Sequence, residues 1–394
     1  MKTLYFDNNA TTAAAPEVIE AMRPFFGEIY GNASSMHEFG GQAQQYVRKA
    51  RESVAALLGA PDPQDIIFTS CGTESDNTAI FSAIRSYPDK RHIVTTRVEH
   101  PAVLNTCRYL QSQGYAVTYL PVDGEGMINL DELRAAVKDD TAVVSIMHAN
   151  NETGVIFPVE EAAQIAKARG AVFHTDAVQS AGKIPLDMAS SAVDMLSISG
   201  HKLNAPKGIG ALYVRKGTRF VPFMMGGHQE RGRRAGTENT PYIAGLGKAC
   251  ELALRRIGGE NTRVKALRDK LERGILAAIP DAKINGGGSP RLPNTANISF
   301  GYVEGESILL MLSDLGVAAS SGSACASGAL EPSHVLRAMG VPFTYAHGSV
   351  RFSLGYGNTE EETDFIIARI PAIIKRLREI SPFGRSGGHA CRAE

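Results

Sequence analysis

Short runs of apolar and β-branched residues alternate with amphipathic stretches through the middle of the chain. Seven of these runs predict strands, over residues 65–70, 92–96, 116–120, 142–147, 171–175, 195–199 and 210–214. Between them, stretches such as 73–86 and 130–138 are amphipathic at helical spacing. Strands that alternate with helices in this way are typical of a mostly parallel sheet covered by helices on both faces.

The pattern changes near residue 261. A charged amphipathic stretch over 261–278 predicts a long helix, and Pro- and Gly-rich turns follow it. Further on, the pattern predicts strands over 295–300 and 350–353 and helices over 307–315 and 360–378. We interpret this part of the chain as a smaller α+β domain.

A chain of 394 residues is too long for one ordinary domain and suits two packed domains. We predict a large α/β domain over residues 16–260, with a seven-stranded, mostly parallel sheet between helices. The smaller domain is expected to combine residues 1–15 with residues 261–382. Residues 383–394 are polar and Gly-rich, and we expect them to form a mobile tail.

Composition narrows the range of partners. Lys plus Arg and Asp plus Glu each number 41, so no net charge attracts nucleic acid or an anionic membrane. No apolar run approaches the roughly 20 residues that a membrane span needs. The first ten residues lack the apolar stretch of a secretory signal. We therefore expect a cytoplasmic protein that binds neither nucleic acid nor membranes.

The cysteines give information about the compartment. They are five in number and widely scattered, at positions 71, 107, 250, 325 and 391. An odd, scattered set argues against a disulfide framework and fits a reducing compartment. Because no CxxC pair is present, a structural zinc or a resident iron–sulfur cluster has little support, and we predict no metal site.

Two polar residues follow neighbouring predicted strands. Lys202 lies in SGHK after the strand over 195–199, and Asp176 directly follows the strand over 171–175. In a parallel sheet, ligands lie at the carboxyl ends of the strands. A lysine that forms a Schiff base, together with an Asp that pairs with a pyridinium nitrogen, is the arrangement that pyridoxal phosphate needs. Alone, Lys202 would be interpreted as a solvated charge; beside Asp176 it indicates a cofactor site.

A phosphate site is indicated where the strand over 65–70 gives way to a helix. Gly72 and Thr73 open that helix, and free N–H groups with a hydroxyl at a helix start bind phosphate. Taken alone, this Gly-Thr pair is most often a simple cap. His100 follows another predicted strand, where its ring can stack on a pyridine face, although a lone His there is more often structural.

Nine motifs, in order, resemble those of the cysteine desulfurases, pyridoxal-phosphate enzymes of fold type I within the class V aminotransferases. They are DNNATT (7–12), GNASSMH (31–37), GTESDN (72–77), VEHP (98–101), NNETG (150–154), HTDAVQ (174–179), SGHK (199–202), GGHQERGRRAGTENT (226–240) and SSGSAC (320–325). The resemblance runs from about residue 3 to residue 380. The segments 226–240 and 320–339 most resemble the NifS branch, which is associated with nitrogenase.

The resemblance implies roles around the cofactor ring. Lys202 corresponds to the Schiff-base lysine and Asp176 to the partner of the ring nitrogen. Gln179 corresponds to a hydrogen-bond donor to the ring hydroxyl. His100 corresponds to a stacking histidine that also moves protons, and Asn151 also contacts the cofactor.

The same resemblance implies how phosphate and substrate are bound. The residues expected to contact the phosphate are Gly72, Thr73, Ser199, His201 and, from a neighbouring subunit, Thr237. The chain is therefore expected to form a homodimer with shared sites. Asn151 and Arg351 correspond to the pair that positions the substrate L-cysteine, and the planar fork of Arg suits a carboxylate.

Cys325 is the residue that points to sulfur chemistry. It lies in AASSGSACASGAL (318–330), a run of small residues that we expect to be mobile, whereas a structural cysteine is expected among apolar neighbours. As a thiolate it can attack the sulfur of bound cysteine, which leaves L-alanine and a Cys325 persulfide. The resemblance further implies transfer of this sulfur to an iron–sulfur scaffold, for nitrogenase maturation, with a transient contact between Cys325 and a nascent cluster.

Three other functions remain open at this point. An aminotransferase on the same fold does not need Cys325. A lyase restricted to selenocysteine would use the same groups as a desulfurase. A sulfur-transfer scaffold without catalysis is disfavoured by the joint presence of Lys202, Asp176, His100 and Cys325.

Overall fold

Seven strands of the computed structural model form one sheet, in the order β2-β8-β7-β6-β5-β3-β4. These strands are β2 (Ile66–Thr69), β3 (His92–Thr96), β4 (Ala116–Leu120), β5 (Thr141–Ser145), β6 (Val172–Asp176), β7 (Met195–Ser199) and β8 (Gly210–Val214). Only β8 runs antiparallel to its neighbours β7 and β2. The predicted α/β fold with a mostly parallel seven-stranded sheet is confirmed, and the strand limits agree with the predictions to within about two residues.

The structure describes residues 3–321 and 332–381. Its helices are α1 (Pro16–Met22), α2 (Glu38–Leu58), α3 (Gly72–Ser86), α4 (Pro101–Ser112), α5 (Leu130–Ala136), α6 (Val159–Ala168), α7 (Thr240–Gly259), α8 (Lys265–Ala278), α9 (Gly305–Asp314), α10 (His334–Ala338), α11 (Phe343–Ala346) and α12 (Glu360–Ile380). In the described ranges, no helix is both long enough and apolar enough to cross a membrane. The expectations for Cys325, Cys391 and the tail over 383–394 lie outside the described residues.

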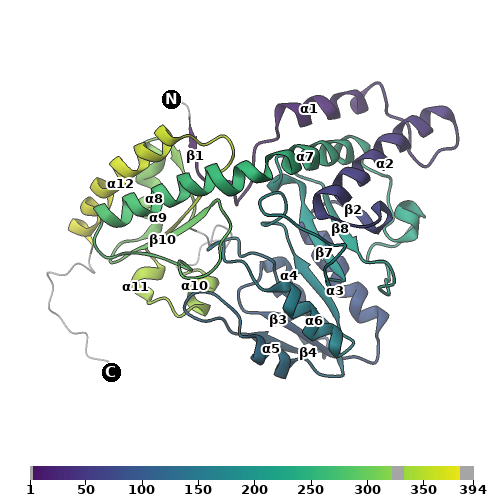
Figure 1. Cartoon of the computed structure of the whole chain (residues 1–394), viewed down its shortest axis with the longest axis horizontal. Helices are drawn as coiled ribbons and strands as arrows, with labels where there is room; N and C mark the ends of the chain where they lie inside the picture. Colours follow the sequence, from purple (N-terminus) through teal and green to yellow (C-terminus); the bar gives the residue numbers. More distant parts are fainter. Residues whose placement is uncertain (1–2, 322–331, 382–394) are drawn as a thin grey trace.

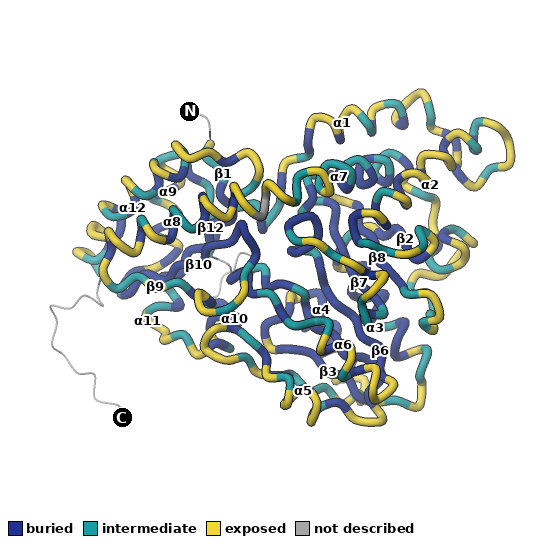
Figure 2. Tube along the Cα trace, in the orientation of Figure 1, coloured by how far each residue is buried: buried dark blue, intermediate teal, exposed yellow. Residues whose placement is uncertain are grey.

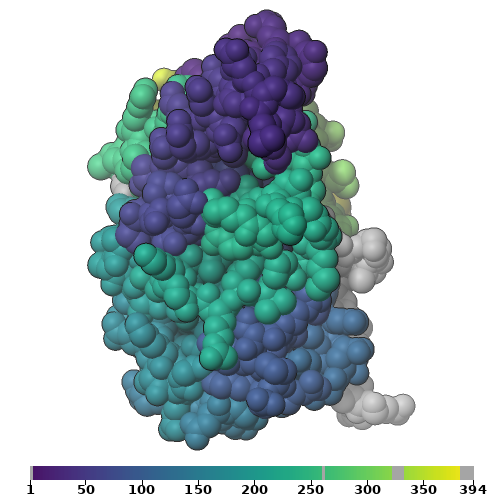
Figure 3. Space-filling view, turned by 90° about the vertical axis from the view of Figure 1, so that its right-hand side faces the viewer, coloured from purple at the N-terminus to yellow at the C-terminus, as the bar shows by residue number. Residues whose placement is uncertain are grey.

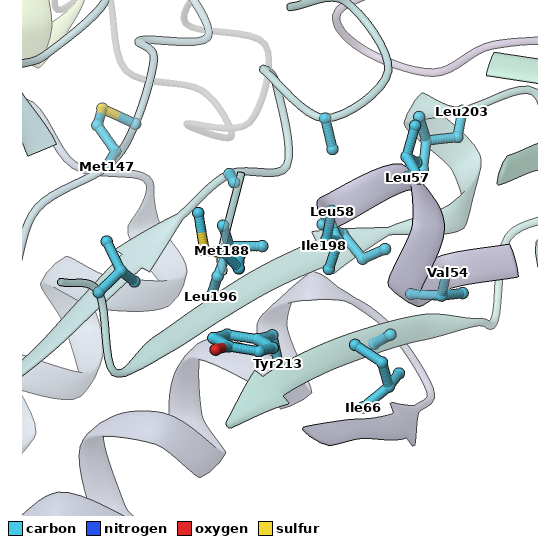
Figure 4. Packing of buried hydrophobic residues seen from close by; sticks show 14 of the residues in the cluster. Val54, Leu57, Leu58, Ile66, Met147, Met188, Leu196, Ile198, Leu203 and Tyr213 are labelled. Atoms are coloured by element: carbon cyan, nitrogen blue, oxygen red, sulfur yellow. The ribbon is translucent and has the colours of Figure 1, made fainter. Parts of the chain in front are cut away.

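Both faces of the large sheet are buried, which explains the nearly continuous apolar strands. Figure 2 shows these strands as buried, except for the mostly half-buried edge strand β4, and the outer surfaces of the helices as exposed. In β8, Leu212 packs with α3 and α4 on one face, whereas Tyr213 packs with α2 and α7 on the other. Figure 4 shows this second face, where Tyr213 lies near Leu196 and Leu58. The helices therefore cover the two faces of the sheet, and the ends of the strands are left uncovered by these layers.

A second, separate hydrophobic cluster forms around a smaller antiparallel sheet. This sheet has the order β12-β10-β9, with β9 (Ala282–Ile284), β10 (Thr295–Phe300) and β12 (Ser349–Ser353). Its core includes residues of α8, α9 and α12 together with Phe6 from the N-terminal segment. That segment also pairs in parallel with this part of the chain, through β1 (Leu4–Tyr5) and β11 (Val317–Ala318). The division into two domains at the predicted limits stays a prediction.

One long helix connects the two clusters. The sequence predicts a helix that begins near residue 261, where the pattern changes. In the structure α7 continues through a π-helical turn (Glu260–Val264) directly into α8, and Figure 1 shows the two in line. The predicted start of this helix was therefore wrong, because a change in composition does not by itself interrupt helical hydrogen bonding.

Candidate functional site

A cavity of about 660 Å³ lies at the carboxyl ends of the parallel strands, where this fold class binds its ligands. The structure brings ten of the predicted site residues to it: Gly72, Thr73, His100, Asn151, Asp176, Gln179, Ser199, His201, Lys202 and Arg351. Thr237 is exposed and lines a different hollow, beside Gly208 and Phe68. The predicted site residues therefore converge in one chain, except for Thr237, which lies elsewhere, and Cys325, which lies outside the described residues.

Lys202 lies at the end of a short 3₁₀ turn (Gly200–Lys202) that follows β7. Its Nζ donates to the backbone oxygens of Asn9 and, at 2.7 Å, of Ala10. Burial, with the positive charges of Arg351 and Lys183, lowers the pKa of the Lys202 amine to about 7. A large fraction of this amine is therefore neutral near pH 7, and a neutral amine is the nucleophile that attacks an aldehyde.

Asp176 ends β6 and is 6% exposed. One carboxylate oxygen accepts a hydrogen bond of 2.8 Å from the backbone N–H of Val178. Burial raises the pKa of Asp176, because a carboxylate loses solvation in this position. A protonated ring nitrogen beside Asp176 would stabilise its ionised form, so this carboxyl suits a cationic aromatic ligand.

The start of α3 forms a cradle next to Asp176. A Cβ on Gly72 would lie 2.9 Å from Val178 Cγ2 and 3.3 Å from Ser199 Cβ, so only glycine allows the helix to begin this close to β6 and β7. His201, which lines the same cavity, contacts Thr11 Oγ1 through Nδ1 at 3.2 Å. Burial and the neighbouring Lys202 lower the pKa of His201 to about 4. A neutral His201 and the free N–H groups of α3 are donors suited to a phosphate.

His100 is the N-cap of α4. Its Nδ1 accepts the backbone N–H of Ala102 at 3.1 Å, which places the ring proton on Nε2 in the neutral form. Burial lowers the pKa of His100, and the nearby carboxylate of Asp176 opposes that shift. The ring lines the cavity as a neutral imidazole whose Nε2 can exchange a proton with a ligand.

Arg351 reaches the cavity from the smaller sheet, on β12. Its guanidinium donates to the backbone oxygen of Asn151 at 3.0 Å and to Asp7 Oδ1 at 2.8 Å. Among the described residues, its buried Nε has no hydrogen-bond partner. The backbone of Arg351 also bonds in both directions to Ser320, so β12 is tied to the chain that leads toward Cys325.

Comparisons with known proteins agree with this geometry. Residues 4–366 match the family model described as aminotransferase class-V. A cysteine desulfurase of Trichormus azollae is 61% identical over 383 residues, 97% of this chain and 96% of that protein. The chain belongs to the cysteine desulfurases of this family. The cysteine desulfurase NifS of Azotobacter vinelandii is 57% identical over 388 residues, 98% of this chain and 96% of that protein.

Solved structures show the same relationship. A NifS-like protein superposes with a TM-score of 0.88 at 42% identity, over 95% of this chain and all of that one. A structure described as SspA in complex with cysteine superposes with a TM-score of 0.79 at 37% identity, over 89% and 99% of the two chains. The expected membership in the NifS-like desulfurases is confirmed.

Enzymes of this family use pyridoxal 5′-phosphate, and the residues present fit that group. Gln179 Oε1 is buried and, within the described part of the chain, has no hydrogen-bond partner, while its Nε2 donates to Asn9 O at 3.1 Å. Gln179 was predicted as a donor to the ring hydroxyl. The free atom in the structure is instead the amide oxygen, although amide oxygen and nitrogen exchange places when the group rotates.

Two residues of DNNATT were missed as site residues. Asn9 is 1% exposed, and its backbone oxygen accepts from both Lys202 and Gln179. Asp7 forms the ion pair with Arg351, the predicted substrate residue. The motif contributed to the family resemblance, but no sequence spacing connects residues 7 and 9 to residues 202 and 351.

Two buried carboxyl groups were also missed. Glu99 is fully buried, and burial raises its pKa to about 8 despite hydrogen bonds from Met147 N and Thr96 Oγ1. Asp76 lines the cavity and is buried, with its Oδ1 3.6 Å from His174 Nε2, and burial followed by the charge of Asp176 raises its pKa well above the ordinary value. Their signal in the sequence was their place in VEHP and GTESDN, where Glu99 stands next to His100 and Asp76 stands three residues after Thr73.

The described cysteines differ in environment. Cys107 and Cys250 are fully buried, and burial raises both thiol pKa values, to about 12 for Cys107. They therefore remain unreactive thiols. Cys71 lines the cavity and caps α3, because its Sγ accepts the backbone N–H of Glu74 at 3.4 Å.

Proposed function

We propose that the chain removes sulfur from L-cysteine and leaves L-alanine and a persulfide on Cys325. The convergence of Lys202, Asp176 and Arg351 on one cavity supports this assignment, because the three supply an amine, a partner for a ring nitrogen and a cation for a carboxylate. The sulfur leaves Cβ of the substrate and bonds to the sulfur of Cys325, and a proton completes the alanine. This transfer balances without an external oxidant.

The side chains divide the work around the cofactor. Pyridoxal phosphate supplies an electron sink for negative charge at the substrate Cα. Asp176 would orient the ring through its nitrogen, and Lys202 would hold the cofactor through its aldehyde and move a proton at Cα of the substrate. His100 is placed to move a proton at Nε2. The start of α3, with Ser199 and His201, binds the phosphate.

The substrate carboxylate is assigned to Arg351 and Asn151. Arg351 has an unpartnered Nε among the described residues, and its Nη2 is paired with the partly exposed Asp7. A substrate carboxylate in the cavity can accept two parallel hydrogen bonds, from Nε and Nη2 of Arg351. The 3% exposure of Arg351 removes most competing water, which strengthens the attraction.

The wider assembly follows from the same reasoning. We propose a cytoplasmic homodimer in which Thr237 contacts the phosphate in the neighbouring subunit, since Thr237 is exposed and lies outside the cavity of its own chain. Large exposed apolar side chains, Tyr30, Met36 and Met225, are consistent with a covered surface. The proposed sulfur acceptor is an iron–sulfur scaffold that serves nitrogenase maturation. The proposed large domain covers residues 16–260, and the smaller domain combines residues 1–15 with residues 261–382.

One experiment tests the reaction. Purified protein is mixed with L-cysteine and a reductant, and alanine and sulfide are measured beside the visible absorption of the cofactor. Both products are expected in equal amounts. Cys325→Ala is expected to keep the absorption and lose sulfide release, whereas the matched variant Cys391→Ala keeps both. Sulfide release at the normal rate by Cys325→Ala would disprove the persulfide assignment.

A parallel assay with L-selenocysteine separates the desulfurase from a lyase restricted to selenium. The two substrates differ at the atom that Cys325 would attack, and Arg351 and Asn151 would bind the amino acid part that the two share. We expect turnover of both. Turnover of selenocysteine alone, with cysteine bound but unreacted, would assign the chain to the selenium-restricted class.

A further inference from the structure

The loop over residues 226–239, here called the Thr237 loop, connects the region after β8 to α7. The part of the chain that contains it is green in Figure 3 and lies on the molecular surface, below the purple N-terminal part. Three of its glycines, Gly226, Gly232 and Gly236, have positive φ angles, so the loop turns sharply several times. Such a loop needs specific contacts to keep one conformation.

The first contact is a buried ion pair. Arg51 of α2 donates to Glu230 through both terminal nitrogens, at 2.7 and 2.8 Å, and both side chains are nearly inaccessible to solvent. Glu230 also accepts the backbone N–H of Phe68 at 3.3 Å, and the Arg51 guanidinium lies over the Phe68 ring. Glu230 and Arg231 have φ angles of 48° and 59°, a strained region for residues with side chains. The contacts above hold Glu230 there, and Arg231 donates to the backbone oxygen of Gln64 at 2.7 Å.

The second contact lies at the start of α3. Arg234 donates to Glu74 through Nε at 2.8 Å and Nη2 at 3.1 Å. The same carboxylate accepts the backbone N–H of Ser70 at 2.7 Å. Burial acts to raise the pKa of Glu74, but the hydrogen bonds from Arg234 and Ser70 outweigh it and the net shift is downward. Glu74 therefore stays ionised and connects the Thr237 loop to the strand–helix junction that carries Gly72 and Thr73.

The contacts of Glu74 indicate whether the Thr237 loop or the junction at the start of α3 depends more on the ion pair with Arg234. The junction keeps two bonds of its own, from Ser70 N to Glu74 and from Glu74 N to Cys71 Sγ, whether or not Arg234 is present. Thr237 lies three residues beyond Arg234, is exposed, and does not line the cavity of its own chain. Loss of Arg234 is therefore expected to release the loop more than the junction.

We infer that Arg234 and Glu230 are positioning residues that act in trans: their ion pairs fix the Thr237 loop so that Thr237 reaches the cofactor phosphate of the partner copy. This inference rests on the homodimer with shared sites proposed above. The start of α3 thus serves two sites, because it binds the phosphate of its own cofactor and anchors the loop that serves the partner's cofactor.

Mixed dimers separate action in trans from action in cis. Two chains with different affinity tags are co-expressed, and dimers that carry both tags are isolated. A chain with Lys202→Ala cannot form the visible band of lysine-bound cofactor, so the band reports only the other chain's site. The measurement is the dissociation constant of pyridoxal phosphate at that site.

In the Arg234→Met homodimer we expect cofactor binding about tenfold weaker, as for loss of one charge-assisted contact. In the first mixed dimer, Lys202→Ala is paired with Arg234→Met, and the reporting site receives an intact loop, so wild-type affinity is expected. In the second, a doubly substituted Lys202→Ala, Arg234→Met chain is paired with wild type, and the reporting site is expected to bind about tenfold more weakly.

The reverse pattern, a weak first dimer and a normal second one, would overturn the inference, because Arg234 would then act on its own site. Wild-type affinity in the Arg234→Met homodimer, or a monomer in sedimentation, would overturn it too. If Arg234→Met does not fold, Arg234→Lys keeps the charge and loses the paired geometry, and the same comparison applies. Arg219→Met, at an exposed arginine, is the matched control. Alanine and sulfide production by wild type tests the proposed function separately.

Discussion

The amine of Lys202 gives a quantitative prediction for binding of the cofactor as a function of pH. Its pKa of about 7 is set mainly by burial and then by the charges of Arg351 and Lys183. Between pH 6 and pH 8 the neutral fraction of an amine with this pKa rises about tenfold and then levels off, whereas that of an ordinary lysine rises about a hundredfold and continues to rise. Because only the neutral amine attacks the aldehyde, the rate of binding should follow the first curve.

The assay removes the cofactor, returns pyridoxal phosphate in excess at a series of pH values, and follows the visible band. The rate with a model alkylamine at each pH corrects for ionisation of the cofactor itself. Arg351→Gln is expected to move the midpoint upward, because a positive charge near Lys202 is lost, while Arg219→Gln at an exposed site should leave it unchanged. A rate that rises about a hundredfold without a plateau would refute the reasoning, since Lys202 would then titrate as a solvated amine.

Three further outcomes are expected. Gly200→Ala should destabilise the fold by about 1–3 kcal/mol in thermal melts, because the added Cβ would lie 2.6 Å from Ile209 Cγ2. The control Gly27→Ala, where the added Cβ meets open space, should change the melting temperature little. Equal melting temperatures of the two variants would contradict this prediction. Asn9→Ala should cost about 1–3 kcal/mol in denaturant unfolding, since its amide group bonds to the backbone oxygen of residue 151 and to the side chains of residues 294 and 295. Glu99 has a folded pKa of about 8, above its unfolded value, so the folded state binds the extra proton and stability falls as pH rises toward 8. Glu99→Gln should flatten this decline, and an unchanged slope would show that Glu99 does not titrate there.

The fold class and much of the site could be predicted from the sequence because their signals are local. A strand buried on both faces is a short continuous apolar run, and helices alternate with such runs, so the parallel sheet could be read from the pattern. Asp176 ends a strand, and Lys202 and Gly72 each lie three residues beyond one. Parallel strands bring their carboxyl ends to one edge of the sheet. The family motifs then identified the cofactor and the reaction without knowledge of any contact.

Other features depend on residues that meet only after folding. Asp7 and Arg351 are 344 positions apart, and Arg51 and Glu230 are 179 apart, and no periodicity connects either pair. The helix start predicted at residue 261 was wrong for a related reason, since helix continuity depends on local hydrogen bonding and not on which core each end packs against.

The sequence by itself therefore determined the mostly parallel α/β sheet, the order of the motifs and the family that they identify. Only the tertiary structure decided which ionisable side chains are buried away from solvent. Lys202 has a lowered pKa, and Glu99 and Asp176 have raised ones, because chain segments distant in sequence exclude solvent from them. Solvation and charge proximity depend on distances in three dimensions, and a linear pattern of residues does not contain those distances.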